Sequence, residues 1–276
     1  MSLGDREAMR DLYGELGEAE WARLEESPRG RVSFEVHREF LGRFVAPGSR
    51  VLEVGAGPGR FTIELAALGA TIAVTDFSPV QLELNRVHVG ASAAEGAVES
   101  RDLLDICDTS RYQDAEFDAV VAYGGPLSYA FEHADAAFAG LLRITRPGGP
   151  VVASVMSTLG SWRYFLEAVL EDTKRSGEDA NDRVLETGDL RYFGTRHICR
   201  MFRSSDIDLL VSRNGGRLLA KSASNWASLG DAALVEGLER DPDRWNRFLR
   251  HEIAACREPG AIDGGTHILF AASTAE

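Results

Sequence analysis

The chain has 276 residues, of which 44% are hydrophobic, so it can bury a sizeable core and global disorder is excluded. Its 30 Lys and Arg against 43 Asp and Glu give a net charge of −13, which argues against a broad nucleic-acid footprint. Three widely spaced cysteines form no CxxC pair, so neither a disulfide framework nor a zinc site is predicted. With no 18-residue apolar run, we expect a cytoplasmic protein without a membrane segment, and the oligomeric state stays open.

Two amphipathic helices are predicted at the start of the chain. Apolar residues recur at helical spacing over residues 5–26, where Gly14 and Gly17 weaken the helix. A second apolar face includes His37 and ends at Pro47-Gly48, and packing is the favoured role for this histidine. We expect residues 1–48 to form a helical lid.

From residue 50 onward, short apolar runs alternate with helical stretches. The runs that read as strands are residues 50–55, 71–76, 97–101, 117–123 and 150–155. Continuous apolar runs are typical of a parallel sheet that helices cover on both faces. The helix after the second run begins with Ser78-Pro79, an N-cap followed by a proline at the first helical position. Residues 49–155 therefore predict a doubly wound α/β core.

The second half of the chain interrupts this pattern and then completes it. Residues 156–203 are rich in aromatic side chains and predict a cap inserted after the fifth strand. Residues 204–276 are expected to complete the core, with last strands near 217–223 and 266–272. A helical insertion at about 231–256 separates those strands, and we expect both insertions to determine substrate choice.

The most specific chemical signal is residues 51–61, VLEVGAGPGRF. A strand enters a glycine-rich turn and then a helix, so the backbone of Gly55, Ala56 and Gly57 can approach a ligand closely. A dinucleotide-binding loop would have the spacing GxGxxG, whereas this loop has GxGxG. Glu53, two positions before the first glycine, would repel a pyrophosphate and suits a cofactor with a cationic amino-acid end.

Two further acids follow the next strands. Asp76, beside Phe77, ends the second strand, where an acid can accept both hydroxyls of a ribose. Asp102, beside Leu103, follows the third run and could accept a hydrogen bond from an adenine amine. Together with Glu53, these acids match the three donor groups of an adenosyl amino acid. At each position the alternative is a strand-end or turn acid that faces solvent.

Five segments resemble motifs of the class I S-adenosylmethionine-dependent methyltransferases. In chain order they are VLEVGAGPGRFTIELA, TIAVTDFSPVQLELN, RDLLDI, FDAVVAYGGPLSY and ITRPGGPVVASV. The resemblance spans about residues 31–155 and implies a mostly parallel, Rossmann-like sheet of seven strands in the order 3-2-1-4-5-7-6, with strand 7 antiparallel. One departure from the family pattern is the stretch between Asp102 and Phe117, which is longer than usual.

The resemblance implies an S-adenosylmethionine site. The residues expected to bind this cofactor are Glu53, Gly55, Ala56, Gly57, Asp76, Phe77, Asp102, Leu103 and Tyr123. We expect transfer of its methyl group to a small-molecule acceptor by in-line displacement, with no metal. Candidates for the acceptor pocket are Tyr129 and His133 after the fourth strand and His197 in the cap.

Other functions remain open at this point. A protein- or RNA-modifying methyltransferase would keep the same cofactor site. A nicotinamide-dependent oxidoreductase is less favoured, because Glu53 and Arg60 in the glycine loop do not suit a pyrophosphate. A non-catalytic cofactor sensor is the non-enzyme alternative. The sequence identifies neither the methyl acceptor nor a catalytic residue.

Overall fold

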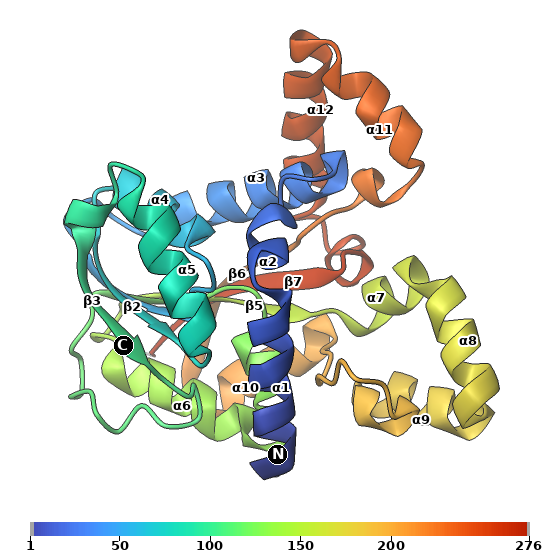
Figure 1. The fold of residues 1–276 in the computed structure, drawn as a ribbon, viewed down its shortest axis with the longest axis horizontal. Coiled ribbons are helices and arrows are strands. Elements are labelled where there is room, and N and C mark those ends of the chain that lie inside the picture. The colour runs from blue at the N-terminus through green and yellow to red at the C-terminus, as the bar shows by residue number, and fades with distance from the viewer. Residues whose placement is uncertain (1–2, 275–276) are drawn as a thin grey trace.

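Seven strands form one sheet in the order β3-β2-β1-β4-β5-β7-β6 (Figure 1). The strands are β1 Arg50–Val54, β2 Thr71–Asp76, β3 Val98–Leu103, β4 Ala119–Ala122, β5 Val151–Met156, β6 Gly216–Ala223 and β7 His267–Thr274. Neighbouring strands are parallel except at β7, which runs antiparallel to both β5 and β6. The computed structural model describes residues 3–274. The predicted strand order and the antiparallel seventh strand are confirmed.

Each face of the sheet has its own apolar core, because consecutive strand residues point to opposite faces. Val51 and Val121 belong to one core, which α3, α4 and α5 cover, while Leu52 and Val120 belong to the other, which α6 and α10 cover. These helices are α3 Pro28–Gly42, α4 Arg60–Ala67, α5 Pro79–Gly90, α6 Ala134–Ile144 and α10 Ser204–Arg213. Burial on both faces explains why the strands read as continuous apolar runs.

Three groups of helices extend from this core (Figure 1). They are α1 Leu3–Leu16 with α2 Glu18–Ala22, α7 Thr158–Tyr164 with α8 Leu166–Ser176 and α9 Glu178–Thr187, and α11 Ala232–Glu239 with α12 Pro242–Ala255. The second group occupies the cap expected at residues 156–203, and the third occupies the insertion expected at about 231–256. Within the described residues, no helix is long and apolar enough to cross a membrane.

The N-terminal helix differs from its prediction. We expected one helix over residues 5–26, but the chain breaks at Gly17, whose φ of 46° is a conformation that glycine adopts more easily than other residues. Ser27 then caps α3 by accepting a hydrogen bond from Gly30 N at 3.1 Å. The break separates α1 from the short helix α2.

Candidate functional site

In open α/β sheets the usual place for a ligand is beyond the carboxyl ends of the strands where the strand order reverses, and here that place lies between β1 and β4. The glycines that follow these strands leave it open. A Cβ built on Gly57 would find its nearest neighbour, Gln81 Oε1, at 4.0 Å, and a Cβ on Gly124 would find nothing within 4 Å. By contrast, a Cβ on Gly55 would meet Pro126 at 2.6 Å, so Gly55 allows close packing instead. We call the space over Gly57 and Gly124 the crevice.

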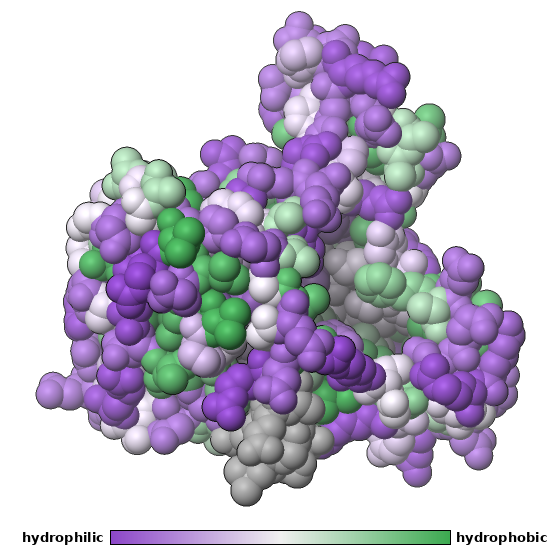
Figure 2. Space-filling model, in the orientation of Figure 1, coloured by the Kyte–Doolittle hydropathy of each residue, from purple (hydrophilic) through white to green (hydrophobic). Residues whose placement is uncertain are grey.

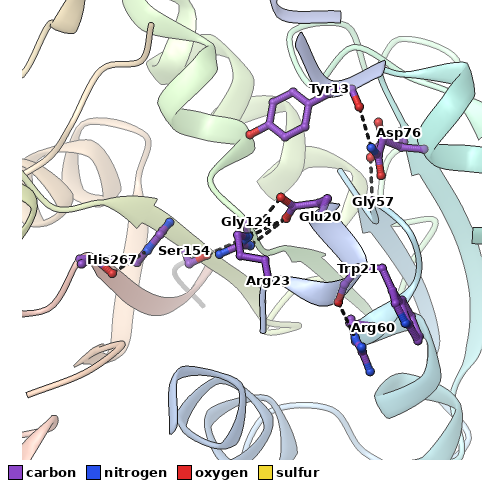
Figure 3. A network of polar contacts seen from close by, with 12 residues as sticks. Tyr13, Glu20, Trp21, Arg23, Gly57, Arg60, Asp76, Gly124, Ser154 and His267 are labelled. Atoms are coloured by element: carbon purple, nitrogen blue, oxygen red, sulfur yellow. Dashed lines mark hydrogen bonds and ion pairs between the residues drawn. The ribbon is translucent and has the colours of Figure 1, made fainter. Parts of the chain in front are cut away.

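Asp76 lies at the border of the crevice and holds its glycine turn. Its carboxylate oxygens accept hydrogen bonds from the backbone N–H groups of Gly57 and Ser78, both at 2.8 Å (Figure 3). Burial raises the pKa of this carboxyl to about 6. Each oxygen keeps a further lone pair, so Asp76 can also accept hydrogen bonds from a ligand. The ring of the next residue, Phe77, lies under the Arg10 guanidinium, with the ring centre 5.8 Å from Arg10 Cζ.

Glu53 is buried beneath the glycine turn. Its side chain is 2% exposed, and its Oε2 accepts a hydrogen bond from Thr62 Oγ1 at 2.6 Å. Thr62 in turn accepts one from Asn85 Nδ2 at 2.9 Å, so the acid belongs to a polar network between β1, α4 and α5. Burial raises the pKa of Glu53 to about 8. Its contact with a cofactor stays a prediction.

The two residues predicted at the third strand face different surroundings. Asp102 forms an ion pair with Arg111 at 3.2 Å, and this arginine comes from the longer stretch that precedes β4. Leu103 is paired with Asp76 in the β2–β3 ladder and is 54% exposed. An exposed leucine beside Asp76 offers an apolar surface on which an adenine could pack. The adenine contact of both residues stays a prediction.

Tyr123 lies behind the crevice, in a cluster of rings. Its hydroxyl donates to the His37 carbonyl at 3.3 Å, and its ring packs edge-on against the rings of His37 and Phe61. Burial lowers the pKa of His37 to about 4, so this imidazole is neutral at pH 7. The environment of His37 agrees with the packing role favoured from the sequence. Cofactor contact by Tyr123 stays a prediction.

A charged pair from the N-terminal segment lies over the crevice. Glu20 Oε1 and Arg23 Nη2 are 2.8 Å apart, and Figure 3 places the pair beside Gly124, between Tyr13 and His267. Arg23 keeps 47% of its side-chain surface accessible. Sequence reasoning missed both residues, because opposite charges three positions apart are the usual pattern of a solvated helix surface.

The two N-terminal helices are fastened to α4 and α5. Gln81 Nε2 donates to the backbone carbonyl of Tyr13 at 2.7 Å. Arg60 Nε donates to the carbonyl of Trp21 at 3.1 Å, and its Cζ lies 3.5 Å from the centre of the Trp21 ring (Figure 3). These contacts join α1 to α5 and α2 to α4, and the role of the two helices as a lid stays a prediction.

Two of the three acceptor-pocket candidates are linked by hydrogen bonds to each other and to Tyr13 of α1. Tyr129 Oη lies 2.5 Å from Tyr13 Oη and 3.0 Å from His197 Nε2. Burial lowers the pKa of His197, so its imidazole is neutral near pH 7 and can accept a proton. The third candidate, His133, lies apart from this chain of hydrogen bonds, with its Nε2 3.8 Å from Glu132.

His267 is a further residue that sequence reasoning missed. It begins β7, its Nδ1 is 3.2 Å from Thr266 Oγ1, and its ring centre lies 6.5 Å from that of His37. Burial and the nearby charge of Arg23 lower its pKa to about 3. A lone histidine at the start of a strand carries no sequence signal. Across residues 3–274, no group of three or more His, Cys, Asp and Glu side chains is placed to hold a metal ion.

The central part of the chain is similar to known methyltransferases. Residues 51–149 match the family model described as "Methyltransferase domain". The chain is 35% identical to the tuberculostearic acid methyltransferase of Mycobacterium tuberculosis over 113 residues, which are 41% of this chain and 25% of the relative. It is also 35% identical to the demethylmenaquinone methyltransferase of Beutenbergia cavernae over 118 residues, 41% of this chain and 42% of that one. The matched part therefore spans less than half the length of these relatives.

Similarity to solved structures extends over almost the whole chain. The magnesium protoporphyrin IX methyltransferase of Synechocystis, solved with bound SAH, has a TM-score of 0.61 at 14% identity and covers 97% of this chain and 98% of its own. The CcbJ methyltransferase of Streptomyces caelestis has a TM-score of 0.56 at 14% identity. The match covers 88% of this chain and 90% of the CcbJ chain. At such low identity, these similarities show the fold alone.

Proposed function

We propose, from the match of residues 51–149 to a methyltransferase domain, that this chain transfers the methyl group of S-adenosylmethionine to a small-molecule acceptor. The observation that carries the proposal is the crevice over Gly57 and Gly124, with Asp76 at one border and the pair Glu20–Arg23 at another. The names of the matched relatives support a small acceptor, since they refer to tuberculostearic acid and demethylmenaquinone.

The residues around the crevice fit this cofactor. Asp76 has free lone pairs for ribose hydroxyls. Gln81 Oε1 is buried without a hydrogen-bond partner among the described residues, and it lies nearest to the open side of Gly57. Glu20 and Arg23 offer one charge of each sign, which matches the ammonium and carboxylate of the methionine end. When bound, S-adenosylmethionine supplies a methyl group that its sulfonium has already activated.

The main tasks left to the protein are to position the acceptor and to exclude water. Helices α1 and α2 cover the crevice and can keep solvent from it. Tyr13, Tyr129 and His197 form a chain of hydrogen bonds from the lid to the cap. An acceptor with an O–H or N–H group beside Tyr13 could pass its proton through Tyr129 to the neutral His197.

The proposal is tested by incubating the protein with methyl-labelled S-adenosylmethionine and separate pools of small molecules, proteins and RNA. We expect mass spectrometry to find S-adenosylhomocysteine together with a labelled small molecule. Label in the protein or RNA pool alone would favour the macromolecule-modifying alternative. Tight binding of S-adenosylmethionine with no turnover in any pool would favour the cofactor sensor.

A further inference from the structure

A second pocket lies between the cap and the arm formed by α11 and α12, where Figure 2 shows the surface hollowed. Its volume is about 530 Å³, within the range of roughly 300–1,000 Å³ usual for small-molecule sites. Its lining residues come from α7 and the loop after β6, and they are Arg163, Tyr164, Trp226, Ala227, Leu229 and Gly230. We call this space the outer pocket.

The outer pocket lies at the same edge of the sheet as the crevice. Strands β5 and β6 both run antiparallel to β7, so they end at one edge, beside the start of β7. Ser224, just after β6, accepts a hydrogen bond from His267 N at 3.1 Å, and Trp226 follows two residues later. The start of β7 is thus bonded to the loop that lines the outer pocket.

Two guanidinium groups lie against aromatic rings in and beside this pocket. Arg163 Cζ is 5.7 Å from the centre of the Trp226 ring, and Arg29 Cζ is 5.3 Å from that of Tyr164. Arg163 Nη2 donates to the Gly264 carbonyl at 2.8 Å, and Arg29 Nη1 donates to the Tyr164 hydroxyl. Within residues 3–274, neither arginine has a carboxylate partner within 4 Å, although the chain has 43 acidic residues.

Apolar side chains continue from the outer pocket onto the cap. The Phe165 ring packs edge-on against Tyr164 with ring centres 4.7 Å apart, and Phe165 is itself 51% exposed. Leu166 and Leu170 on α8 are also exposed. The surface around the pocket therefore combines unpaired positive charge, flat aromatic faces and an apolar border.

We propose that the outer pocket binds the methyl acceptor and that this acceptor is an anion with a flat, apolar body. This inference rests on the proposed methyl transfer and names its substrate class. The anionic group binds Arg163, which has donors left over from its bond to Gly264. The flat body packs on Trp226 and extends along Phe165. An amphiphilic anion matches both the charge and the apolar border of the pocket, whereas a polycation matches neither.

The test compares two probes of equal shape, 2-naphthoate and the neutral 2-naphthamide, by calorimetry on the full chain. We expect 2-naphthoate to bind about tenfold more tightly or better, because a charge-assisted hydrogen bond contributes more than a neutral one. Arg163→Met should remove this preference, Arg163→Lys should keep part of it, and Ala227→Trp should block both probes by filling the pocket. The matched control Arg213→Met, at the opposite edge of the sheet, should change neither probe.

Affinity for S-adenosylhomocysteine is measured on the same variants, so that the two proposals can fail separately. Equal affinity of the two probes for the unmodified chain, or 2-naphthoate binding that Arg163→Met and Ala227→Trp leave unchanged, would overturn the outer-pocket proposal while the cofactor site stands. Absence of S-adenosylhomocysteine binding by the unmodified chain would instead overturn the proposed function.

Discussion

Replacing Glu53 by glutamine separates the cost of burying this acid from its use in binding. Burial raises the pKa of Glu53 from 4.5 to about 8. The native state therefore keeps a proton that the unfolded state releases, so the free energy of unfolding falls as pH rises from about 4.5 to about 8. At pH 7 the acid is about 2.5 pH units above its unfolded pKa, which corresponds to a cost of about 3 kcal/mol.

Glutamine has nearly the same shape, carries no charge and can still accept the hydrogen bond from Thr62. We expect Glu53→Gln to raise the free energy of unfolding by up to about 3 kcal/mol at pH 7 and to change it little at pH 4.5. If the carboxylate attracts the cofactor's ammonium, the same variant should bind S-adenosylhomocysteine about tenfold more weakly, or about 1.4 kcal/mol.

Urea unfolding at pH 4.5, 6 and 7.5, with calorimetry of S-adenosylhomocysteine binding, measures both effects. Glu83→Gln, an exposed acid on α5, is the matched control and should change stability by less than about 0.5 kcal/mol. A Glu53→Gln protein that is less stable than its parent at pH 7.5, or a stability difference that does not grow with pH, would refute the buried-charge argument. Unchanged binding would remove Glu53 from the cofactor site.

Other substitutions address the crevice and the cap. Asp76→Ala should weaken S-adenosylhomocysteine binding by about 1–3 kcal/mol, because the ribose hydroxyls lose their acceptor, and calorimetry showing equal affinity would exclude that role. Gly57→Val should abolish measurable binding, since a β-branched side chain at φ 54° strains the turn and fills the crevice; binding that persists at near-normal affinity would contradict this. His197→Ala should slow methyl transfer. It should keep the affinity for S-adenosylhomocysteine within about threefold of that of the unmodified chain, or roughly 0.7 kcal/mol. If a folded His197→Ala protein loses both methyl transfer and S-adenosylhomocysteine affinity, His197 lies at the cofactor instead.

The core of the fold was predictable because its signals are local. The glycine turn after β1, the Ser78-Pro79 start of α5 and the continuous apolar runs each depend on a few adjacent residues. Two-sided burial of Val51 and Leu52 in separate cores is the physical origin of those runs. The family resemblance then supplied the order of the strands, which adjacent residues alone do not determine.

The contents of the site depend on tertiary contacts that sequence patterns do not record. Glu20 and Arg23 come from the short segment that follows the break at Gly17, and no local pattern records where that segment packs. Asp102 pairs with Arg111 from a loop whose path the sequence does not specify. The outer pocket brings together Arg163 and Trp226, which are 63 positions apart in the sequence.

The central claim is that the crevice over Gly57 and Gly124 binds an adenosyl amino acid rather than a dinucleotide. Calorimetric titration of the chelator-treated protein with S-adenosylhomocysteine, and separately with NAD, tests it most directly. We predict binding of one S-adenosylhomocysteine per chain, no measurable binding of NAD, and loss of the S-adenosylhomocysteine signal in Gly57→Val. Binding of NAD with equal affinity, or no binding of S-adenosylhomocysteine, would contradict the claim.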